Sequence, residues 1–233
     1  MLRITDLAAG YGGSQVLHSL SLHVDDGETV VVLGPNGHGK TTLLRAISGL
    51  VRPTAGTVAL DGQIITTLQP ADIVAAGVIH IPQGDLIFPE LTVMDNLSMG
   101  AYRPEAWQER KQKLEQVFQL FPDLAERKGQ LARSLSGGER RMLALGRGLM
   151  GKAKILMIDE PALGLAPFLI ENVYQTIQDI RKTGLSILLM DESAEHVAGL
   201  ADRVYLLESG TLVREGTADE MLRDEVLLSA YLG

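Results

Sequence analysis

The sequence contains no cysteine among its 233 residues. Disulfide bonds and thiolate metal sites are therefore excluded, and the redox compartment is left undetermined. Long hydrophobic runs are missing too, because TVVVL, KILMI and LSILLM are far shorter than the roughly 18 apolar residues that span a bilayer. The N-terminal stretch lacks a basic leader followed by an apolar core, so no signal peptide is expected. These absences favour a cytoplasmic protein and leave docking on a membrane protein open.

An excess of basic residues is also absent, since the formal net charge is −8 at pH 7. A nucleic-acid partner is therefore not expected, because such a partner requires a local basic stripe on the surface. The nearest candidate is ERKQK at residues 109–113, where Glu109 and Lys113 are spaced i,i+4 among further acids. That spacing is typical of a solvated helix face. The apolar content of 45% is ample for a packed interior.

A glycine-rich stretch follows the apolar run TVVVL and matches the phosphate-loop pattern G-x-x-x-x-G-K-[ST]. In this pattern backbone N–H groups surround the phosphates, Lys40 reaches the β- and γ-phosphates, and the Thr41 hydroxyl ligates Mg²⁺. The helix expected to start near Gly39 directs its positive end at the same anion. The alternative, an ordinary glycine-rich turn, is disfavoured by the buried-type strand before it and the apolar-periodic helix after it. The candidate nucleotide-binding residues of this loop are Gly34, Pro35, Asn36, Gly37, His38, Gly39, Lys40, Thr41 and Thr42.

Strand and helix patterns alternate along most of the chain. Residues 1–33 read as strands, and hairpins are expected through the Asp61-Gly62 and Ser209-Gly210 turns. KILMID and LSILLMD read as buried strands with an amphipathic helix between them. Alternating units around a phosphate loop imply a parallel sheet with helices on both faces. The helix between those strands has apolar residues on one face at Ile170, Val173, Ile177 and Ile180.

From about residue 88 to residue 148 the pattern is helical only, with no strand signal. We therefore expect a single domain over residues 1–233, in which residues 88–148 form a helical subdomain and residues 1–87 and 149–233 form the nucleotide-binding core with a β subdomain. The expected fold class is α/β: a P-loop NTPase (RecA-like) core with a mostly parallel sheet, an N-terminal antiparallel β subdomain and an inserted helical subdomain. The stretch WQERKQKLEQVFQLF has the amphipathic-helix spacing i, i+3, i+4, i+7 at Leu114, Val117, Phe118 and Phe121.

Two adjacent carboxylates end the strand KILMIDE at residues 154–160. Asp159 is predicted to hold Mg²⁺ through water, as in other phosphate-loop enzymes. Glu160 is predicted to orient or polarise an attacking water. Seen alone, the pair could equally be two solvent-exposed acids at a strand terminus, but the phosphate loop in the same chain favours the functional interpretation.

The stretch LSGGE at residues 135–139 precedes a helix-forming segment and makes a second anion-binding helix start. The chain thus carries two phosphate-binding devices about a hundred residues apart, in different subdomains. One γ-phosphate cannot easily be reached by both within a single chain. A head-to-tail pair of chains, in which each signature closes over the other's nucleotide, is the expected solution.

These motifs together resemble those of the ATP-binding-cassette (ABC) ATPases, from end to end of the chain. The resemblance implies ATP and Mg²⁺ as ligands. It assigns Tyr11 to stacking on adenine, and Gln83 to sensing Mg²⁺ and the γ-phosphate while linking the core to the helical subdomain. It also assigns the signature positions to Ser136, Gly137 and Gly138.

Further stretches are similar to the ATPase subunits of branched-chain amino acid importers, whose close relatives serve urea and amide uptake. These stretches are DLIFPELTVMDNLSMGAY, LFPDLAERK, DEPALGLAP and SAYLG. The resemblance implies a motor subunit on the cytoplasmic face of the membrane. It also implies a second ABC ATPase chain, two transmembrane permeases and, indirectly, a periplasmic or extracellular solute-binding protein as partners.

The chain departs from the ABC pattern at several positions. Glu192 occupies the place where most of the family has a histidine that touches the γ-phosphate, and a carboxylate there is a like-charge contact. His38 stands where the family has a small residue, and we hypothesise that it faces the dimer seam and compensates Glu192 or meets the partner's ALGLA loop; an inert, outward His38 is the alternative. His196 is expected at the surface. Ala166 replaces the aspartate usual in the inter-subunit loop, which favours a dedicated partner over self-pairing.

Other classes of function stay open at this stage. One is a subunit that clamps nucleotide while its partner hydrolyses most of the ATP, supported by Glu192 and opposed by the intact Glu160. Another is a soluble ABC protein acting on DNA or ribosomes, which usually carries a coiled-coil insertion or a second cassette that this chain has no room for. An unrelated phosphate-loop GTPase or kinase would lack the LSGGE signature.

Overall fold

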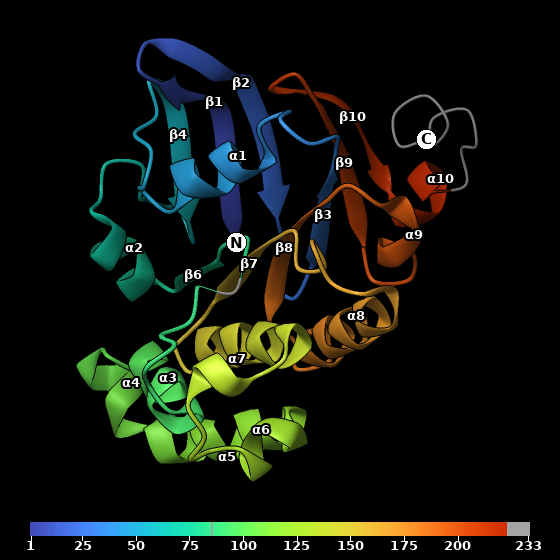
Figure 1. Cartoon of the computed structure of the whole chain (residues 1–233). Coiled ribbons are helices and arrows are strands. Elements are labelled where there is room, and N and C mark those ends of the chain that lie inside the picture. The colour runs from blue at the N-terminus through green and yellow to red at the C-terminus, as the bar shows by residue number, and fades with distance from the viewer. Residues whose placement is uncertain (85, 223–233) are drawn as a thin grey trace.

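The computed structural model describes residues 1–84 and 86–222. Two sheets form its framework, a four-stranded sheet in the order β2-β1-β4-β5 and a six-stranded sheet in the order β10-β9-β3-β8-β7-β6 (Figure 1). The strands are β1 (Leu2–Tyr11), β2 (Ser14–Val24), β3 (Thr29–Leu33), β4 (Ala55–Leu60), β5 (Gln63–Ile64), β6 (Val78–Ile81), β7 (Ile155–Asp159), β8 (Ser186–Asp191), β9 (Arg203–Glu208) and β10 (Thr211–Thr217). The helices are α1 (Lys40–Ile47), α2 (Pro70–Ala76), α3 (Val93–Gly100), α4 (Pro104–Gln108), α5 (Arg110–Leu120), α6 (Pro122–Glu126), α7 (Gly137–Leu149), α8 (Pro167–Arg181), α9 (Ala194–Val197) and α10 (Ala218–Leu222), with a 3₁₀ turn at Ala132–Ser134.

The larger sheet is mostly parallel, as expected. Strands β9, β3, β8, β7 and β6 pair in parallel, and only β10 is antiparallel to its neighbour. The four-stranded sheet is antiparallel throughout and contains the N-terminal strands. The α/β P-loop NTPase fold predicted from the sequence is therefore confirmed. The last residues of the chain, including the SAYLG stretch, lie outside the described residues.

Both faces of the larger sheet are buried, which explains why its strands read as unbroken apolar runs. Along β3, Val31 and Leu33 belong to the core shared with α7 and α8. Val30 and Val32 belong to the core shared with α1 and the four-stranded sheet. Helices were predicted on both faces of this sheet, and helices alone cover one of them (Figure 1). The other face is covered by α1 together with the second sheet (Figure 1).

The two predicted hairpins form at the expected turns. β4 and β5 pair antiparallel across Asp61 and Gly62, and both turn residues have positive φ, 50° and 80°. β9 and β10 pair across Ser209 and Gly210. A Cβ atom at Gly210 would lie 1.7 Å from the carbonyl oxygen of Val16, so only glycine fits this turn against β2.

Helices α3 to α7 follow one another with no named strand between them, in the segment predicted to be helical, and α7 ends one residue beyond it at Leu149. The boundaries proposed for the subdomains stay predictions. The single long amphipathic helix expected over WQERKQKLEQVFQLF is instead two helices, α4 and α5, that meet at Glu109. Phe121 lies just past α5, because the proline after it disfavours helical geometry at this position. Glu109 forms an ion pair with Lys152, 2.6 Å away.

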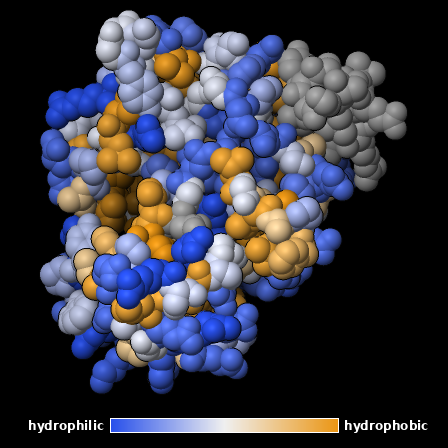
Figure 2. Space-filling model, in the orientation of Figure 1, coloured by the Kyte–Doolittle hydropathy of each residue, from blue (hydrophilic) through white to orange (hydrophobic). Residues whose placement is uncertain are grey.

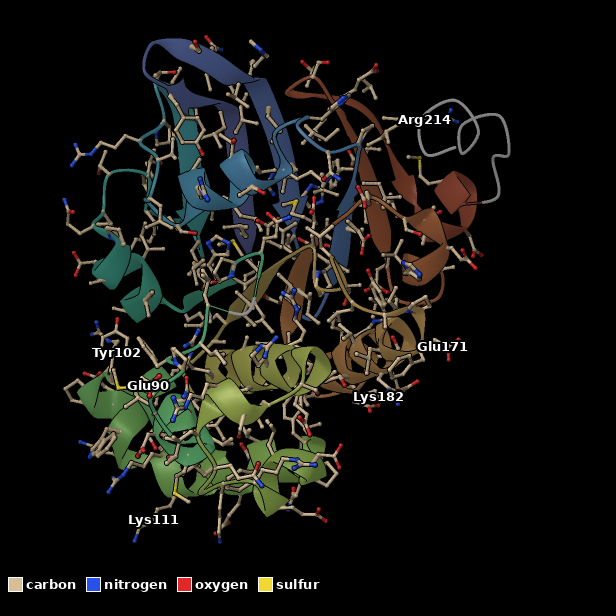
Figure 3. All side chains as sticks on the ribbon, in the orientation of Figure 1. Glu90, Tyr102, Lys111, Glu171, Lys182 and Arg214 are labelled. Atoms are coloured by element: carbon tan, nitrogen blue, oxygen red, sulfur yellow. The ribbon has the colours of Figure 1, made fainter. Side chains whose placement is uncertain are left out.

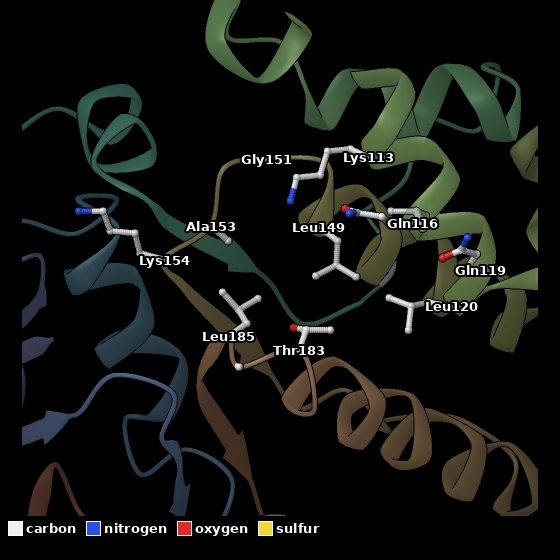
Figure 4. A pocket seen from close by; sticks show the side chains of 12 residues that line it. Lys113, Gln116, Gln119, Leu120, Leu149, Gly151, Ala153, Lys154, Thr183 and Leu185 are labelled. Atoms are coloured by element: carbon white, nitrogen blue, oxygen red, sulfur yellow. The ribbon is translucent and has the colours of Figure 1, made fainter. Parts of the chain in front are cut away.

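A cavity of about 620 Å³ opens between α5, the end of α7 and the start of β8 (Figure 4). Leu149, Leu185 and Leu120 supply apolar walls, and Lys113 and Gln116 supply polar ones. Residues 153 and 154 at its edge precede β7, so this cavity lies at the amino ends of the parallel strands, opposite the phosphate loop. Within the described residues, no helix combines the length and the hydrophobicity needed to cross a membrane.

Candidate nucleotide-binding site

The phosphate loop connects the carboxyl end of β3 to α1, as the sequence predicts. Gly34 N–H donates to the carbonyl oxygen of Asp191 at 3.2 Å, which joins the start of the loop to the end of β8. Gly39 caps α1 with φ at 108°, and a Cβ atom there would lie 2.9 Å from the Leu17 side chain. Both observations explain the need for glycine at position 39. The loop is also held from the β9–β10 turn, where Gly210 N–H donates to the His38 carbonyl at 3.0 Å.

Lys40, the first residue of α1, turns back under the loop. Its side chain is almost fully buried, and its ammonium donates to the carbonyl oxygens of Gly34 at 2.6 Å and Pro35 at 3.1 Å. The same ammonium lies 3.0 Å from Oε1 of Glu160. A buried cation with three oxygen neighbours is well compensated, and these bonds keep the lysine at the point where the loop would receive phosphate.

Glu160 bridges the two polar elements of the site. Its other carboxylate oxygen accepts a hydrogen bond from Gln83 Nε2 at 2.8 Å, so Lys40 and Gln83 hold opposite sides of one carboxylate. Glu160 is 6% exposed and has φ at 43°, in the left-handed region that non-glycine residues rarely adopt. Such backbone strain is concentrated at functional sites. The structure thus brings together three residues that the sequence analysis selected separately.

Asp159 is the residue whose surroundings fit a metal ion. Both of its carboxylate oxygens are buried, and neither has a hydrogen-bond partner among the described residues. Burial raises the pKa of the Asp159 carboxyl, and the nearby Thr41 hydroxyl and Lys40 ammonium oppose that rise. Unpartnered carboxylate oxygens beside a threonine hydroxyl form an oxygen donor set of the type Mg²⁺ prefers. No group of three His, Cys, Asp or Glu residues within residues 1–84 and 86–222 is placed to hold a metal on its own.

Glu192 lies at the rim of the site and contacts the phosphate loop directly. Its Oε2 accepts a hydrogen bond from the Asn36 side-chain amide at 2.6 Å. Within the chain the His38 ring accepts the Ser209 backbone N–H at Nδ1, 3.1 Å away. The hypothesis that His38 faces the dimer seam and compensates Glu192 or meets the partner's ALGLA loop stays a prediction. The β9–β10 turn passes beside the loop and draws the His38 ring toward itself, so Asn36 is the neighbour that reaches Glu192.

Two residues that sequence analysis missed lie behind Glu192. Tyr174 of α8 donates its hydroxyl proton to the carboxylate of Asp191, the last residue of β8, and both side chains are buried. His196, expected at the surface, is only partly exposed and stacks on the Tyr174 ring with centroids 5.0 Å apart. The polar ends of the buried pair were not distinguishable in sequence, because Tyr174 follows the apolar helix pattern and Asp191 follows an apolar strand.

The remaining predicted residues occupy two other places. Tyr11, at the end of β1, is 44% exposed, and its hydroxyl accepts from Arg45 of α1 at 3.4 Å. Ser136 caps α7 on the opposite side of the sheet from α1: the α7 side chains pack in the core below the sheet and those of α1 in the core above it (Figure 1). Within one chain the signature and the phosphate loop are therefore not brought together. The roles assigned to Tyr11, to the signature and to the phosphate-loop residues stay predictions.

The fold and this phosphate loop define the class of the protein, a P-loop NTPase. A family model described as ABC transporter matches residues 17–163, and the chain belongs to the ABC transporter ATP-binding family. It is an ABC-type ATPase. ATPases of this family act with a partner ATPase in a dimer and with membrane permease components.

Known relatives match the chain over its whole length. The high-affinity branched-chain amino acid transport ATP-binding protein BraG of Pseudomonas aeruginosa is 37% identical, with all of both chains covered. The probable branched-chain amino acid transport ATP-binding protein LivF of Archaeoglobus fulgidus is 38% identical over all of this chain and 99% of its own. The lipopolysaccharide export system ATP-binding protein LptB of Haemophilus influenzae is 32% identical over all of this chain and 97% of its own.

Solved ABC cassettes have the same fold. A nucleotide-free ATP-binding cassette of an ABC transporter superposes with a TM-score of 0.84 at 25% identity and covers 100% of this chain and 99% of its own. A cassette in its ADP conformation gives the same TM-score at 26% identity, over 98% of this chain and 97% of its own. The resemblance to ABC ATPases inferred from the motifs is confirmed by these matches.

Proposed function

We propose that this chain binds and hydrolyses ATP as the motor subunit of an ABC importer for branched-chain amino acids or a related small solute. The observation that carries the proposal is the full-length similarity to BraG and LivF, at 37% and 38% identity. The similarity to LptB is lower, at 32%, and makes an export motor the second candidate. A motor for urea or amide uptake is a third possibility within the importer class.

Hydrolysis in this proposal starts from the buried contact between Lys40 and Glu160. When triphosphate enters the loop, its oxygens compete with Glu160 for the Lys40 ammonium and replace it as the partner of the lysine. The Glu160 carboxylate is then free to orient the attacking water. Gln83 donates to the other Glu160 oxygen and limits where the released carboxylate can move. Thr41, Gln83 and Asp159 are the residues that would hold Mg²⁺, which when bound would supply positive charge to offset that of the phosphates.

A second ABC ATPase is needed to complete this site. Ser136, the N-cap of α7, is exposed, so the signature helix start is accessible to a ligand from outside the chain. We propose that Ser136, Gly137 and Gly138 of one chain cap the triphosphate in its neighbour. The exposed Ala166 stands in the loop between subunits, without the acid usual there, which supports a dedicated partner.

Permease docking is proposed for the apolar face where α2, α3 and α4 meet. Figure 2 shows hydrophobic side chains around a hollow on this side of the molecule, and Figure 3 labels Tyr102 near α4. A cavity of about 320 Å³ lies here, lined by Val74, Ile79, Tyr102 and Ala106 among others. Exposed apolar patches of this kind mark protein interaction sites, and a groove between helices suits an amphipathic helix of a permease. Docking there would place the chain on the cytoplasmic face of the membrane. The exposed large apolar residues of α3, α4 and the turn between them are Met99, Tyr102 and Trp107.

The hydrolytic role is tested by Glu160→Gln, with Glu171→Gln of α8, an exposed glutamate, as the matched control. Because the amide cannot take up a proton as a carboxylate does, ATP turnover should fall on the order of 10²-fold or more while ATP binding persists. The control should hydrolyse ATP at the wild-type rate. Equal turnover in both variants would reject the role of Glu160. Single-turnover hydrolysis in the assembled pair would show whether this chain only clamps nucleotide.

The solute is tested by uptake in the source cells. Cells that carry Glu160→Gln in place of the wild-type chain should lose uptake of labelled leucine, isoleucine and valine, and cells with Glu171→Gln should keep it. A second arm uses Tyr102→Asp, which places a charge on the proposed docking face and should reduce uptake without changing ATP turnover of the purified chain. Normal leucine uptake with defective urea uptake, or with defective lipopolysaccharide transport, would replace the branched-chain proposal by one of the alternatives.

A further inference from the structure

Tyr174 and Asp191 form a buried polar pair next to the nucleotide site. Tyr174 is 8% exposed and Asp191 is 5% exposed, and they come from different elements, the middle of α8 and the end of β8. The tyrosine hydroxyl donates to Oδ2 of the aspartate. A buried carboxylate is costly unless it is hydrogen-bonded, so a pair of this kind needs a reason to be retained in a core.

The remaining contacts of Asp191 indicate that reason. Its Oδ1 accepts the backbone N–H groups of Glu192 at 2.8 Å and Ser193 at 3.0 Å, which fixes the turn after β8. Its carbonyl oxygen accepts the N–H of Gly34, the first residue of the phosphate loop. One residue therefore holds both the turn that carries Glu192 and the start of the loop.

Glu192 makes a second link between the turn after β8 and the phosphate loop. Its carboxylate accepts the Asn36 side-chain amide at 2.6 Å, so the turn after β8 is joined to the phosphate loop by a side-chain bond as well as by a backbone bond. A cavity of about 200 Å³ lies against this turn, and Glu160, Tyr174, Asp191 and Glu192 are among its lining residues. Displacement of the turn would therefore move Glu192 relative to both Glu160 and Asn36.

We propose that Tyr174 and Asp191 are positioning residues for ATP hydrolysis, because their buried hydrogen bond fixes the turn that presents Glu192 to the phosphate loop. This inference rests on the ATPase activity proposed above. The pair also ties α8 to the nucleotide site. The loop at residues 161–166, which is expected to meet the partner cassette, leads directly into α8. The Tyr174–Asp191 hydrogen bond therefore couples the position of that loop to the position of Glu192.

Burial and the neighbouring groups act in opposite directions on the Asp191 carboxylate. Burial raises the pKa of Asp191, and the Tyr174 hydroxyl, the N–H groups of Ser193 and Glu192, and the His196 ring of α9 all oppose that rise. Glu160, at the end of β7, and Glu192 are the acidic groups on the Tyr174 side of the pair. Removal of the tyrosine hydroxyl would take away the strongest of the opposing contacts.

The first test compares two buried tyrosines. Tyr174→Phe removes the hydroxyl from the Asp191 carboxylate but keeps the ring that stacks on His196. Tyr205→Phe, the matched control, removes a buried hydroxyl from the Glu215 carboxylate in β10, away from the β8 turn. Both variants should lose similar thermal stability. Only Tyr174→Phe should lower kcat for ATP, roughly tenfold, with KM within about twofold of wild type, because small displacements of positioned groups cost rate rather than binding.

A double-mutant cycle and a pH profile separate positioning from general damage. If Tyr174 acts through Asp191, adding Tyr174→Phe to Asp191→Ala should change kcat by less than about twofold.

The acid limb of the kcat profile of Tyr174→Phe should also move to higher pH, because Asp191 then accepts a proton more readily, whereas Tyr205→Phe should keep the wild-type profile. Equal kcat in the two tyrosine variants, or additive effects in the cycle, would overturn the inference while wild-type hydrolysis persists. Absence of ATP hydrolysis by the wild-type chain would instead reject the proposed function itself.

Discussion

At the scale of single residues, the carboxyl edge of the larger sheet gathers groups that are costly to bury. Asp159 has two buried oxygens without a hydrogen-bond partner in the described part of the chain, Glu160 has a strained backbone, and the charged Lys40 side chain is buried. Each feature opposes folding when taken alone. Their meeting at one edge indicates that the arrangement serves ligand binding, because ligand groups complete the missing contacts.

His80 of β6 provides a residue-scale prediction of pH dependence. Its Nδ1 lies 2.8 Å from the Ser48 hydroxyl, and its buried Nε2 has no hydrogen-bond partner within residues 1–84 and 86–222. Burial, together with Arg45, lowers the pKa of His80 from 6.5 to about 4. The unfolded chain binds the proton first as pH falls. The stabilising contribution is therefore complete above about pH 6.5 and is lost between about pH 6.5 and pH 4.

The measurement is the free energy of unfolding of His80→Gln and of wild type at pH 7.5 and pH 4.5. The variant should lose less stability on acidification, by up to roughly 3 kcal/mol, since one pKa unit corresponds to about 1.4 kcal/mol. His18→Gln, at an exposed position of β2, is the control and should follow wild type. Identical acid sensitivity of His80→Gln and wild type would contradict the assignment.

At the scale of elements, the start of α7 combines a structural and a proposed functional role. Ser136 Oγ accepts from the Glu139 N–H at 3.3 Å, and the Glu139 carboxylate accepts from the Ser136 N–H at 2.7 Å, which is a capping box. The backbone bond to Ser136 is the largest contribution that holds the pKa of Glu139 below its usual range. The helix end is therefore ordered before any partner arrives.

Ser136→Ala separates these two roles when it is compared with Thr92→Ala. Thr92 caps α3 by accepting from Asp95 N–H at 3.1 Å, so both substitutions remove one helix cap in the same region of the chain. Each should lower stability by about 1 kcal/mol in thermal unfolding. Only Ser136→Ala should reduce ATP turnover of the assembled pair. A matching reduction in Thr92→Ala would mean that loss of helix order alone explains the effect.

At the scale of the whole molecule, the sheet separates two cores. The upper core, with α1 and the four-stranded sheet, supports the phosphate loop, and the lower core, with α7 and α8, supports the signature. No rotation of side chains can bring one to the other through a packed sheet. Two chains in opposite orientation can satisfy both sites, which is the physical reason for proposing a head-to-tail arrangement.

Engineered cysteines test that arrangement in a sequence that has none of its own. A chain carrying Ser136→Cys, Gly37→Cys and Glu160→Gln should form a disulfide-linked dimer when ATP is present and much less of it with ADP. Position 37 has space for the side chain, because a Cβ there meets no atom within 4 Å, but its φ of 82° strains a cysteine backbone, so ATP binding of the variant is measured first. Thr92→Cys in place of Ser136→Cys is the control and should give no dimer. Failure to crosslink, both alone and with a second cassette from the same cells, would contradict the arrangement.

Much of this architecture could be predicted because its causes are local. The phosphate loop, the Asp61-Gly62 turn and the N-cap at Ser136 depend on backbone freedom and hydrogen bonds within a few residues, which residue type reveals directly. The break between α4 and α5 at Glu109 was missed because the helical spacing of apolar residues continues from one helix into the next. The hydrogen bond between Asn36 and Glu192 was not predicted, since it joins two segments 156 residues apart whose approach depends on how the strands pack.

The sequence by itself determined the class of fold, the ligand chemistry of the phosphate loop and the resemblance to ABC ATPases, because each depends on short motifs and on hydrophobic periodicity. Only the tertiary structure decided that Glu160 joins Lys40 to Gln83, that Asn36 holds Glu192, and that Tyr174 supports Asp191 from α8. These contacts join segments separated by 17 to 156 residues along the chain. Such pairs are set by how the sheet and helices pack, and packing leaves no periodic signal in the polar residues that it brings together.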